Sequence, residues 1–293
     1  MVYMKQSSIV VIDLGGTKIN VGLYRSGKIA YQCIKPFDAQ LSVSESIQFI
    51  LQEINDVKAQ DTVAIAIGVP SIVDVEHGIV YNAINIKAWQ KVALKKELEQ
   101  LTQLPVYVNN DVNCFTKGEH SAHSEQGFQN VVGLCLGTGL GAGFVIKDQL
   151  YTGTNCCAGE LGGVQYLNAT FDSYCSGQFF IENFGECGAE LAKKANEGDN
   201  KAKVAFELFG QHLASAISHL LLIIDPQIII LGGSVAKSYD LFIDSLWLHL
   251  QSFPYPNVIK NLIIEQSQQH HSALLGAAQL YLDSQEQQAC FAS

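Results

Sequence analysis

The sequence is short of basic residues. Its 18 Lys and Arg stand against 28 Asp and Glu, which gives a formal net charge of −10 at pH 7. Nucleic acids and anionic lipid surfaces are bound largely through positive charge, so we expect neither a nucleic-acid partner nor a membrane partner. A small anion is still compatible with this composition, because backbone amides can hold it locally.

The chain also lacks a long apolar segment and a dense set of cysteines. No apolar run approaches the roughly 18 residues of a membrane-spanning helix, and the first letters, MVYMKQSS, contain no apolar core of a signal peptide. The eight cysteines are scattered over 293 residues. These features predict a cytoplasmic protein whose cysteines are mostly free thiols.

The P-loop pattern G-x-x-x-x-G-K-[ST] is absent, but a different glycine turn stands near the N-terminus. The segment Asp13-Leu-Gly-Gly-Thr-Lys18 separates an apolar strand pattern at 10–12 from another at 20–24. Two glycines permit backbone torsions and close approaches that a side chain would block, and amides in such a turn can face a phosphate. The Asp13 carboxylate could hold magnesium, often through water. An ordinary hairpin turn is the alternative that these residues leave open.

The second half of the chain opens in the same way. Residues 131–146, VVGLCLGTGLGAGFVI, again read as an apolar strand, a glycine turn and an apolar strand. At a constant offset, Gly16, Thr17 and Gly22 fall on Gly137, Thr138 and Gly143. Two such hairpins, one from each half, could hold one polyphosphate from both sides, although two unrelated hairpins would give the same pattern.

The remaining patterns predict alternating helices and strands, which is typical of an α/β protein. Helices are expected at 42–57, 90–102, 201–225, about 239–250 and 272–282, and strands at 62–70, 105–111, 228–234 and 261–267. Residues 151–200 are rich in polar and glycine islands and are expected to be irregular.

Six motifs in order now identify a resemblance. They are DLGGTK (13–18), GVP with a following Asp (68–74), NND (109–111), LGTGLGAGF (136–144), GELGG (159–163) and LGGS (231–234). This set resembles the ROK family of sugar kinases, within the actin-like ATPase superfamily, from about residue 8 to residue 284. The resemblance implies an α/β, two-lobed actin-like ATPase (ribonuclease H-like) fold in which each lobe is a mixed sheet flanked by helices. It implies a small lobe at 1–112, joined by a C-terminal helix at about 272–284, and a large lobe at 113–271.

The resemblance also implies an ATP and Mg²⁺ site. The first phosphate loop matches Asp13, Gly15, Gly16, Thr17 and Lys18, the second matches Thr138, Gly139 and Gly141, and the glycine pair near the adenosine matches Gly232 and Gly233. Asp13 would be the magnesium residue, through water. Lys18 has an alternative role as a solvated lysine at a strand end.

On the sugar side, the resemblance implies that Asp111 is the general base on the sugar hydroxyl and that Asn110 hydrogen-bonds a neighbouring hydroxyl. Capping of the next helix is the structural alternative for Asp111. Gly68 opens the segment 68–90 that would shape the sugar pocket. Glu160 would bind sugar hydroxyls.

The chain departs from the family pattern after Glu160. The family usually has a histidine three residues later, where this chain has Gly163. The usual zinc-binding segment lines up with 173–182, where Ser173 and Phe180 replace two cysteines and only Cys175 remains. A structural zinc site needs four nitrogen or sulfur ligands, so we expect no zinc. A site rebuilt from Cys156, Cys157 and Cys187 is the remaining alternative.

Glu182 matches the family's last sugar-binding glutamate, or it is a glutamate favoured at a helix start by the dipole. With the zinc ligands gone, Phe179 and Phe180 are hypothesised to fill the space of the metal centre.

Taken together, the sequence predicts a kinase that transfers the γ-phosphoryl of ATP to a hexose hydroxyl, most often the 6-hydroxyl in this family, with glucose as first choice. An N-acetylhexosamine kinase, for N-acetylglucosamine or N-acetylmannosamine, is the second choice. From another class, a non-catalytic sugar-sensing regulator is the alternative. The acidic charge and the seven residues before the first strand weigh against a DNA-binding repressor. The resemblance suggests a homodimer.

Overall fold

The computed structural model of this protein describes residues 7–291, and the chain divides into two compact units. Unit 1 comprises 1–125, 152–158 and 269–293, and unit 2 comprises 126–151 and 159–268. In this division the first segment of unit 1 ends at Glu125, and a short segment after position 151 also belongs to unit 1. The first six letters of MVYMKQSS lie outside the described residues.

Unit 1 is built on a five-stranded mixed sheet of order β3-β2-β1-β4-β8. The strands are β1 (Ser8–Leu14), β2 (Lys18–Arg25), β3 (Lys28–Pro36), β4 (Thr62–Val69) and β8 (Val106–Asn110), and a second small sheet holds β5 (Ile72–Asp74), β6 (Ile79–Tyr81) and β7 (Lys91–Val92). The helices are α1 (Val43–Val57), α2 (Leu94–Thr102), α3 (Asp111–Ala122) and α10 (Ser272–Phe291). Strands β1, β2 and β3 pair antiparallel, whereas β1, β4 and β8 pair parallel.

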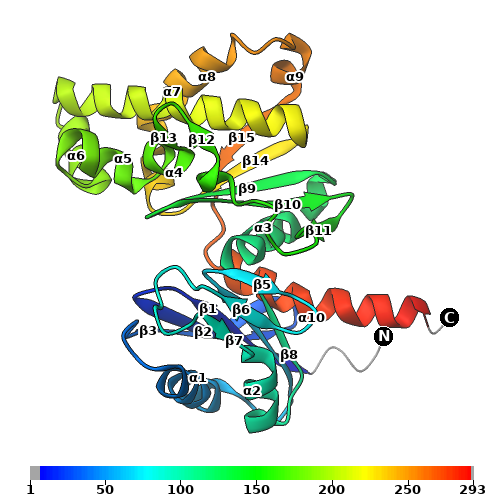
Figure 1. Ribbon diagram of the computed structural model, residues 1–293. Helices are drawn as coiled ribbons and strands as arrows, with labels where there is room; N and C mark the ends of the chain where they lie inside the picture. The colour runs from blue at the N-terminus through cyan, green and yellow to red at the C-terminus, as the bar shows by residue number, and fades with distance from the viewer. Residues whose placement is uncertain (1–6, 292–293) are drawn as a thin grey trace. The chain divides into compact units, whose positions relative to one another are not determined.

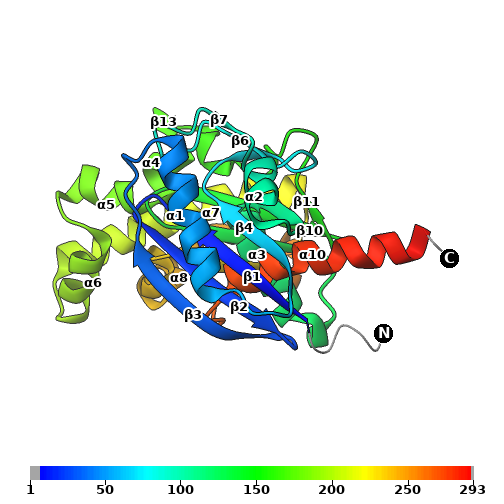
Figure 2. The same ribbon diagram turned by 90° about the horizontal axis from the view of Figure 1, so that it is seen from below.

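The apolar side chains of β1 pack on both faces of this sheet. Val10, Ile12 and Leu14 belong to one buried cluster, which includes residues of α1 and α2, and Ile9 and Val11 belong to another, which includes residues of α10. Successive side chains of a strand point to opposite faces, so an uninterrupted apolar run fits a strand covered on both sides. Figure 2 shows α1 lying along one face of the strands.

Unit 2 contains a second five-stranded sheet, of order β11-β10-β9-β14-β15. Its strands are β9 (Val131–Leu136), β10 (Leu140–Ile146), β11 (Gln149–Tyr151), β14 (Ile228–Gly232) and β15 (Ile263–Gln266), and a separate hairpin is formed by β12 (Gln165–Tyr166) and β13 (Ala169–Thr170). The helices are α4 (Phe171–Cys175), α5 (Gly177–Phe184), α6 (Gly188–Asn196), α7 (Asn200–Ile223), α8 (Tyr239–Leu250) and α9 (Pro256–Asn261) (Figure 1).

The two sheets share one strand plan. In each sheet the first three strands in sequence pair antiparallel in succession. Two later strands add in parallel on the other side of the first strand, one beside it and one beyond. The weak repeat seen in the sequence therefore corresponds to a repeated sheet topology with one glycine hairpin in each unit.

The expectation that 151–200 is irregular is wrong, because α4, α5 and α6 lie there. These helices have five to nine residues each, which is too short for the period of an amphipathic helix to be read. They depend on local signals and tertiary packing: Ser176 caps α5, and Gly185 ends it at φ 76°. The Phe180 ring is fully buried against Phe206 and Phe209 of α7.

Helix α7 is the one helix within residues 7–291 that is long and apolar enough by composition to cross a membrane. Half of its apolar window is buried inside the protein, and Phe206, Phe209, Leu213 and Ile217 are fully buried. These contacts make α7 a core helix of unit 2.

In unit 1, α3 and α10 touch through their backbones. A Cβ atom on Gly118 would lie 1.9 Å from the Ser272 carbonyl oxygen, and one on Gly276 would lie 1.7 Å from the Cys114 carbonyl oxygen. An ion pair between Lys117 Nζ and an Asp283 carboxylate oxygen, 2.9 Å apart, spans the same helices. Small residues at these two positions therefore fix how α10 lies on the helix that begins at Asp111.

The substitution Gly276→Ala tests this contact, because the contact reverses the sign of the expected change in the free energy of unfolding. In an ordinary helix interior, Gly to Ala stabilises by about 1 kcal/mol. Here overpacking should instead lower the free energy of unfolding by about 1–3 kcal/mol, measured by urea denaturation. Gln287→Ala, on the exposed end of α10, is the control and should leave stability nearly unchanged. A stabilised Gly276→Ala variant would contradict the close contact.

Candidate active site

The polar residues of unit 1 gather at the carboxyl ends of its parallel strands. Asp13 of β1 pairs with Gly68 of β4, and Gly68 pairs with Asn109 of β8, so these three residues form one row across the sheet. Asp111 follows two residues after Asn109. In open α/β sheets ligands bind outside this edge.

The first glycine turn joins β1 to β2. The Gly15 amide donates to the Lys18 carbonyl oxygen at 2.9 Å. Neither Gly15 nor Gly16 has a positive φ, so unusual torsion is not the reason for the glycines. A Cβ on Gly16 would lie 2.3 Å from Cβ of Asn85, so the close approach of another loop requires glycine there. Thr17 and Lys18 are exposed at the tip.

Asp13 carries an unusual carboxyl group. Loss of solvation raises its pKa from 3.8 to about 6, against the opposing charge of Lys18. A carboxylate oxygen held at a strand end is a ligand type that Mg²⁺ prefers, and a cation would favour its charged form. The side chain therefore fits a magnesium-binding role, and Lys18 affects it electrostatically.

Asp111 is the first residue of α3, and its neighbour caps the helix. The Asn110 side-chain oxygen accepts from the amides of Val112 at 2.9 Å and Asn113 at 3.1 Å. The Asn110 side-chain amide donates to the Ser71 carbonyl oxygen at 3.2 Å. Capping is therefore the role of Asn110, while an Asp111 carboxylate oxygen accepts from the Val112 amide at 2.9 Å.

Gly68 lets β4 approach the start of α3. A Cβ there would lie 3.3 Å from Cα of Asp111 and 3.2 Å from Sγ of Cys114. Gly68 is buried, so its contribution is to backbone packing below Asp111. Burial, and then the charges of Asp111 and Asp13, raise the pKa of Cys114 well above its usual value. The charges of Asp111 and Asp13 therefore both act on Cys114 in unit 1.

In unit 2, the second glycine turn is held by an aspartate that the sequence analysis missed. The turn is closed by the Gly137 amide, which donates to the Gly139 carbonyl oxygen at 3.0 Å, and it leaves Thr138 exposed. An Asp172 carboxylate oxygen accepts from the Leu140 amide at 2.6 Å. A Cβ on Gly139 would lie 2.9 Å from that oxygen, so a larger residue there would displace the Asp172 carboxylate. Gly141 lies in β10, paired with Cys135 of β9.

Asp172 also acts electrostatically on Glu160. Loss of solvation, and next the charge of Asp172, raise the pKa of Glu160. A Cβ on Gly162 would lie 2.5 Å from the Leu140 carbonyl oxygen and 3.0 Å from an Asp172 carboxylate oxygen. Two carboxylates therefore converge beside the second glycine turn. The sequence pattern does not point to Asp172, because this residue lies in α4, a helix too short to show an amphipathic period.

Glu182 and Gly163 are the remaining positions of unit 2 that the family pattern singles out. Glu182 is exposed on α5, whereas Gly163 is exposed with open space around the position of a Cβ. Of these acidic residues of unit 2, Asp172 and Glu160 are electrostatically linked.

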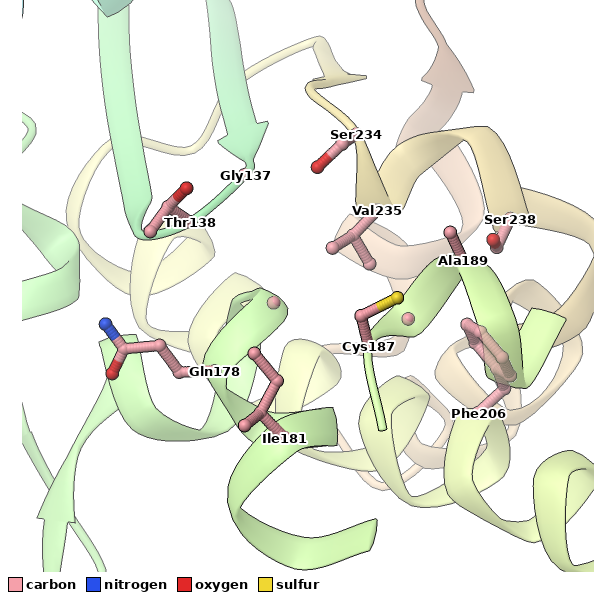
Figure 3. A pocket seen from close by; sticks show the side chains of 12 residues that line it. Gly137, Thr138, Gln178, Ile181, Cys187, Ala189, Phe206, Ser234, Val235 and Ser238 are labelled. Atoms are coloured by element: carbon pink, nitrogen blue, oxygen red, sulfur yellow. The ribbon is translucent and has the colours of Figure 1, made fainter. Parts of the chain in front are cut away.

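A pocket of about 230 Å³ opens beside the second glycine turn (Figure 3). It is lined by Gly137, Thr138, Gly177, Gln178, Ile181, Cys187, Gly188, Ala189, Phe206, Ser234, Val235 and Ser238. The Gly177 amide donates to the Gly137 carbonyl oxygen at 2.8 Å, which joins the start of α5 to the turn. The lining mixes small residues, apolar side chains and helix starts, and its size suits one ring system rather than a whole nucleotide.

The glycine pair at the end of β14 lies against the same turn. Gly233 has φ 89°, and a Cβ on it would lie 2.5 Å from the Leu136 carbonyl oxygen at the end of β9. Gly232 pairs with Cys135 in the sheet. The pair therefore places Ser234 and Val235 at the pocket, next to Thr138.

The segment expected to lack zinc packs as a hydrophobic core. Cys175 is fully buried, and burial, followed by the charge of Asp172, raises its pKa far above the usual value, which disfavours the thiolate that a metal needs. Within residues 7–291, no group of three His, Cys, Asp or Glu side chains is placed to hold a metal. The absence of zinc stays a prediction.

Asp13→Asn tests the electrostatic origin of the Asp13 pKa. Because the folded-state pKa is near 6 and the ordinary value is 3.8, the folded wild type binds the extra proton between these values and loses stability as pH rises through them. The Asn side chain does not ionise, so it stays neutral across this pH range. In the absence of metal, Asp13→Asn should be more stable than wild type by about 1–3 kcal/mol above pH 7, with the difference vanishing near pH 4. Urea unfolding across this pH range measures it, and a constant difference would contradict the assignment.

Comparisons with known proteins agree with these features. The ROK family profile matches residues 9–284. The glucokinase of Thermotoga maritima is 26% identical, with 94% of this chain and 98% of that protein covered. The N-acetyl-D-glucosamine kinase of Photobacterium profundum is 31% identical, with 77% and 83% covered.

Solved structures show the same fold. A ROK family protein from Streptococcus pneumoniae, solved in complex with sucrose, superposes with a TM-score of 0.82 at 25% identity, covering 96% of this chain and 99% of that one. A ROK glucokinase from Streptomyces griseus, solved with glucose and AMPPNP, gives a TM-score of 0.78 at 24% identity, covering 94% and 99%. The two-lobed actin-like α/β fold is thereby confirmed, and because the family match spans nearly the whole chain, this protein belongs to the ROK family.

Proposed function

We propose that this ROK protein is an ATP-dependent sugar kinase that phosphorylates a hexose hydroxyl, with the 6-hydroxyl of glucose as the first candidate. The observation that carries the proposal is the placement of Asp111. It starts α3 at the carboxyl edge of β1, β4 and β8, and it shares that edge with Asp13. The glucokinase and the N-acetyl-D-glucosamine kinase among its relatives, which cover 94% and 77% of this chain, support the same reaction class.

Within unit 1, Asp111 acts as the general base. Its carboxylate orients the sugar hydroxyl and accepts its proton as the new O–P bond forms. Asn110 holds the start of α3 through its cap and can still offer hydrogen bonds to a neighbouring hydroxyl. Asp13 would hold Mg²⁺ through water, and ATP supplies the transferable phosphoryl group.

The glycine turns would bind the phosphates. In unit 1 the turn comprises Gly15, Gly16, Thr17 and Lys18, and in unit 2 it comprises Thr138, Gly139 and Gly141. The 230 Å³ pocket beside Thr138 suits the adenine ring, with Gly232 and Gly233 placing the adjoining lining. Backbone amides and a hydroxyl can meet the phosphate oxygens without a P-loop.

The acceptor site of unit 2 centres on Glu160. Loss of solvation, and next the charge of Asp172, raise the pKa of Glu160. Two carboxylates can accept hydrogen bonds from several sugar hydroxyls. Glu182 is the second acidic contact expected from the sequence, and Asp172 is a further candidate because its charge acts on Glu160.

An N-acetylhexosamine is the second candidate acceptor. The relative at 31% identity is an N-acetyl-D-glucosamine kinase. Gly163 leaves open space near Glu160, where a larger acceptor substituent could be tolerated. A homodimer, suggested by the family resemblance, is part of the same proposal.

The direct test is ATP consumption by the purified protein over a panel of glucose, mannose, fructose, N-acetylglucosamine and N-acetylmannosamine. We expect turnover with at least one sugar, and Asp111→Asn should lower kcat by about 10²- to 10⁴-fold while sugar binding stays detectable by calorimetry. Glu125→Gln, an exposed change in unit 1, is the control.

Two outcomes would remove this proposal. Sugar binding without turnover in the wild type would indicate a sugar-sensing module instead of a kinase. Full activity in Asp111→Asn would show that another group is the base.

A matched pair of variants decides between the two acidic candidates of unit 2. Asp172→Asn should raise KM for the sugar at least about tenfold, because it removes a charge beside Glu160 and weakens the turn at Leu140. Glu182→Gln, on the exposed face of α5, should change KM less than about twofold. Steady-state kinetics with saturating ATP measures both, and the reverse order would favour Glu182.

A further inference from the structure

Cys156 has a backbone conformation that does not suit its residue type. Its φ is 54°, in the left-handed region that glycine adopts freely and that a side chain disfavours. Its side chain is nevertheless 4% exposed and belongs to the main core cluster of unit 1. A residue held in a strained conformation by its surroundings is often there for the contacts of its side chain.

The Cys156 thiol contacts the two asparagines on either side of Asp111. Its Sγ donates to the Asn109 side-chain oxygen at 3.7 Å and accepts from the Asn113 side-chain amide at 3.6 Å. The same Asn113 amide group donates to the Asn109 oxygen at 3.0 Å, so the three side chains form a closed ring of hydrogen bonds. All three residues are buried.

This ring bears directly on the backbone that carries Asp111. The Asn109 side-chain oxygen also accepts from the Asn110 amide at 2.8 Å. Asn113 lies one turn into α3, where its own amide donates to the Asn110 cap. The ring therefore fixes the end of β8 and the first turn of α3 relative to each other, with Asp111 between them.

The position of Cys156 in the chain adds to this role. The segment Thr152–Ala158 belongs to unit 1, although the residues before and after it belong to unit 2. The segment contributes one buried side chain to the core clusters described for unit 1, and that side chain is Cys156.

We propose that Cys156 is a positioning residue, whose thiol orients Asp111 through Asn109 and Asn113. The inference rests on the proposed function for the kinetic consequence, but the hydrogen-bond ring itself does not. A serine at 156 can donate and accept in the same place, whereas alanine and glycine cannot. Glycine would in addition relieve the backbone strain.

The experiment compares Cys156→Ser, Cys156→Ala and Cys156→Gly, with Cys157→Ala as the matched control, since Cys157 is adjacent and exposed. For Cys156→Ala and Cys156→Gly we expect kcat to fall by about three- to tenfold with KM for ATP unchanged, and Cys156→Ser to restore most of it. The melting temperature of Cys156→Gly should be no lower than that of Cys156→Ala, because glycine relieves the strain of the left-handed backbone and this offsets the lost packing of the Cβ.

A second measurement does not depend on activity. Amide hydrogen exchange in peptides covering 108–118 should become about tenfold faster in Cys156→Ala and Cys156→Gly, but stay as in wild type in Cys156→Ser and Cys157→Ala. Unchanged exchange in the alanine and glycine variants would overturn the proposal. If the wild type phosphorylates none of the sugars, the proposed function fails while the exchange result still decides this inference. If exchange rises but an active wild type shows no fall in kcat, the positioning role is overturned.

Discussion

The register of three parallel strands is the constraint on which unit 1 depends. Because Asp13, Gly68 and Asn109 pair across β1, β4 and β8, the polar residues Asp13 and Asn109 lie at one edge of the sheet, with Gly68 between them. A slip of one residue would turn each side chain to the opposite face and separate these groups. The register is specified by the apolar side chains on both faces, such as Val10 and Val11, which belong to different buried clusters.

Close backbone approach is the second theme, and glycine makes it possible at several distinct places. Gly68 lets β4 reach the start of α3, and Gly276 lets α10 lie directly on that helix. In unit 2, Gly139 and Gly162 leave space for the Asp172 carboxylate, and Gly233 lies against the end of β9. Glycine is favoured at these positions because a Cβ would meet neighbouring atoms, most severely at Gly276, and a positive φ adds to the preference at Gly233.

Much of the fold and part of the candidate site could be predicted from the sequence. The glycine hairpins and the weak repeat between them correspond to two sheets with the same strand plan, because apolar runs and turn residues are local signals. The helices α4, α5 and α6 were missed, since they are too short to show a period and depend on packing against α7. With α4 missed, Asp172 was missed as well. Asn110 and not Asp111 proved to be the helix cap, a distinction that needs the direction of each side chain.

By itself, the sequence determined the order of strands and turns, the acidic surface and the family resemblance, because each is carried by neighbouring residues or by composition. Only the tertiary structure decided which distant residues meet: Asp172 with the Leu140 amide, Gly16 with Asn85, and Cys156 with the asparagines around Asp111. These meetings depend on strand register and on how closely backbones pack. Such quantities arise from many weak contacts summed over a whole unit, and no short stretch of sequence contains them.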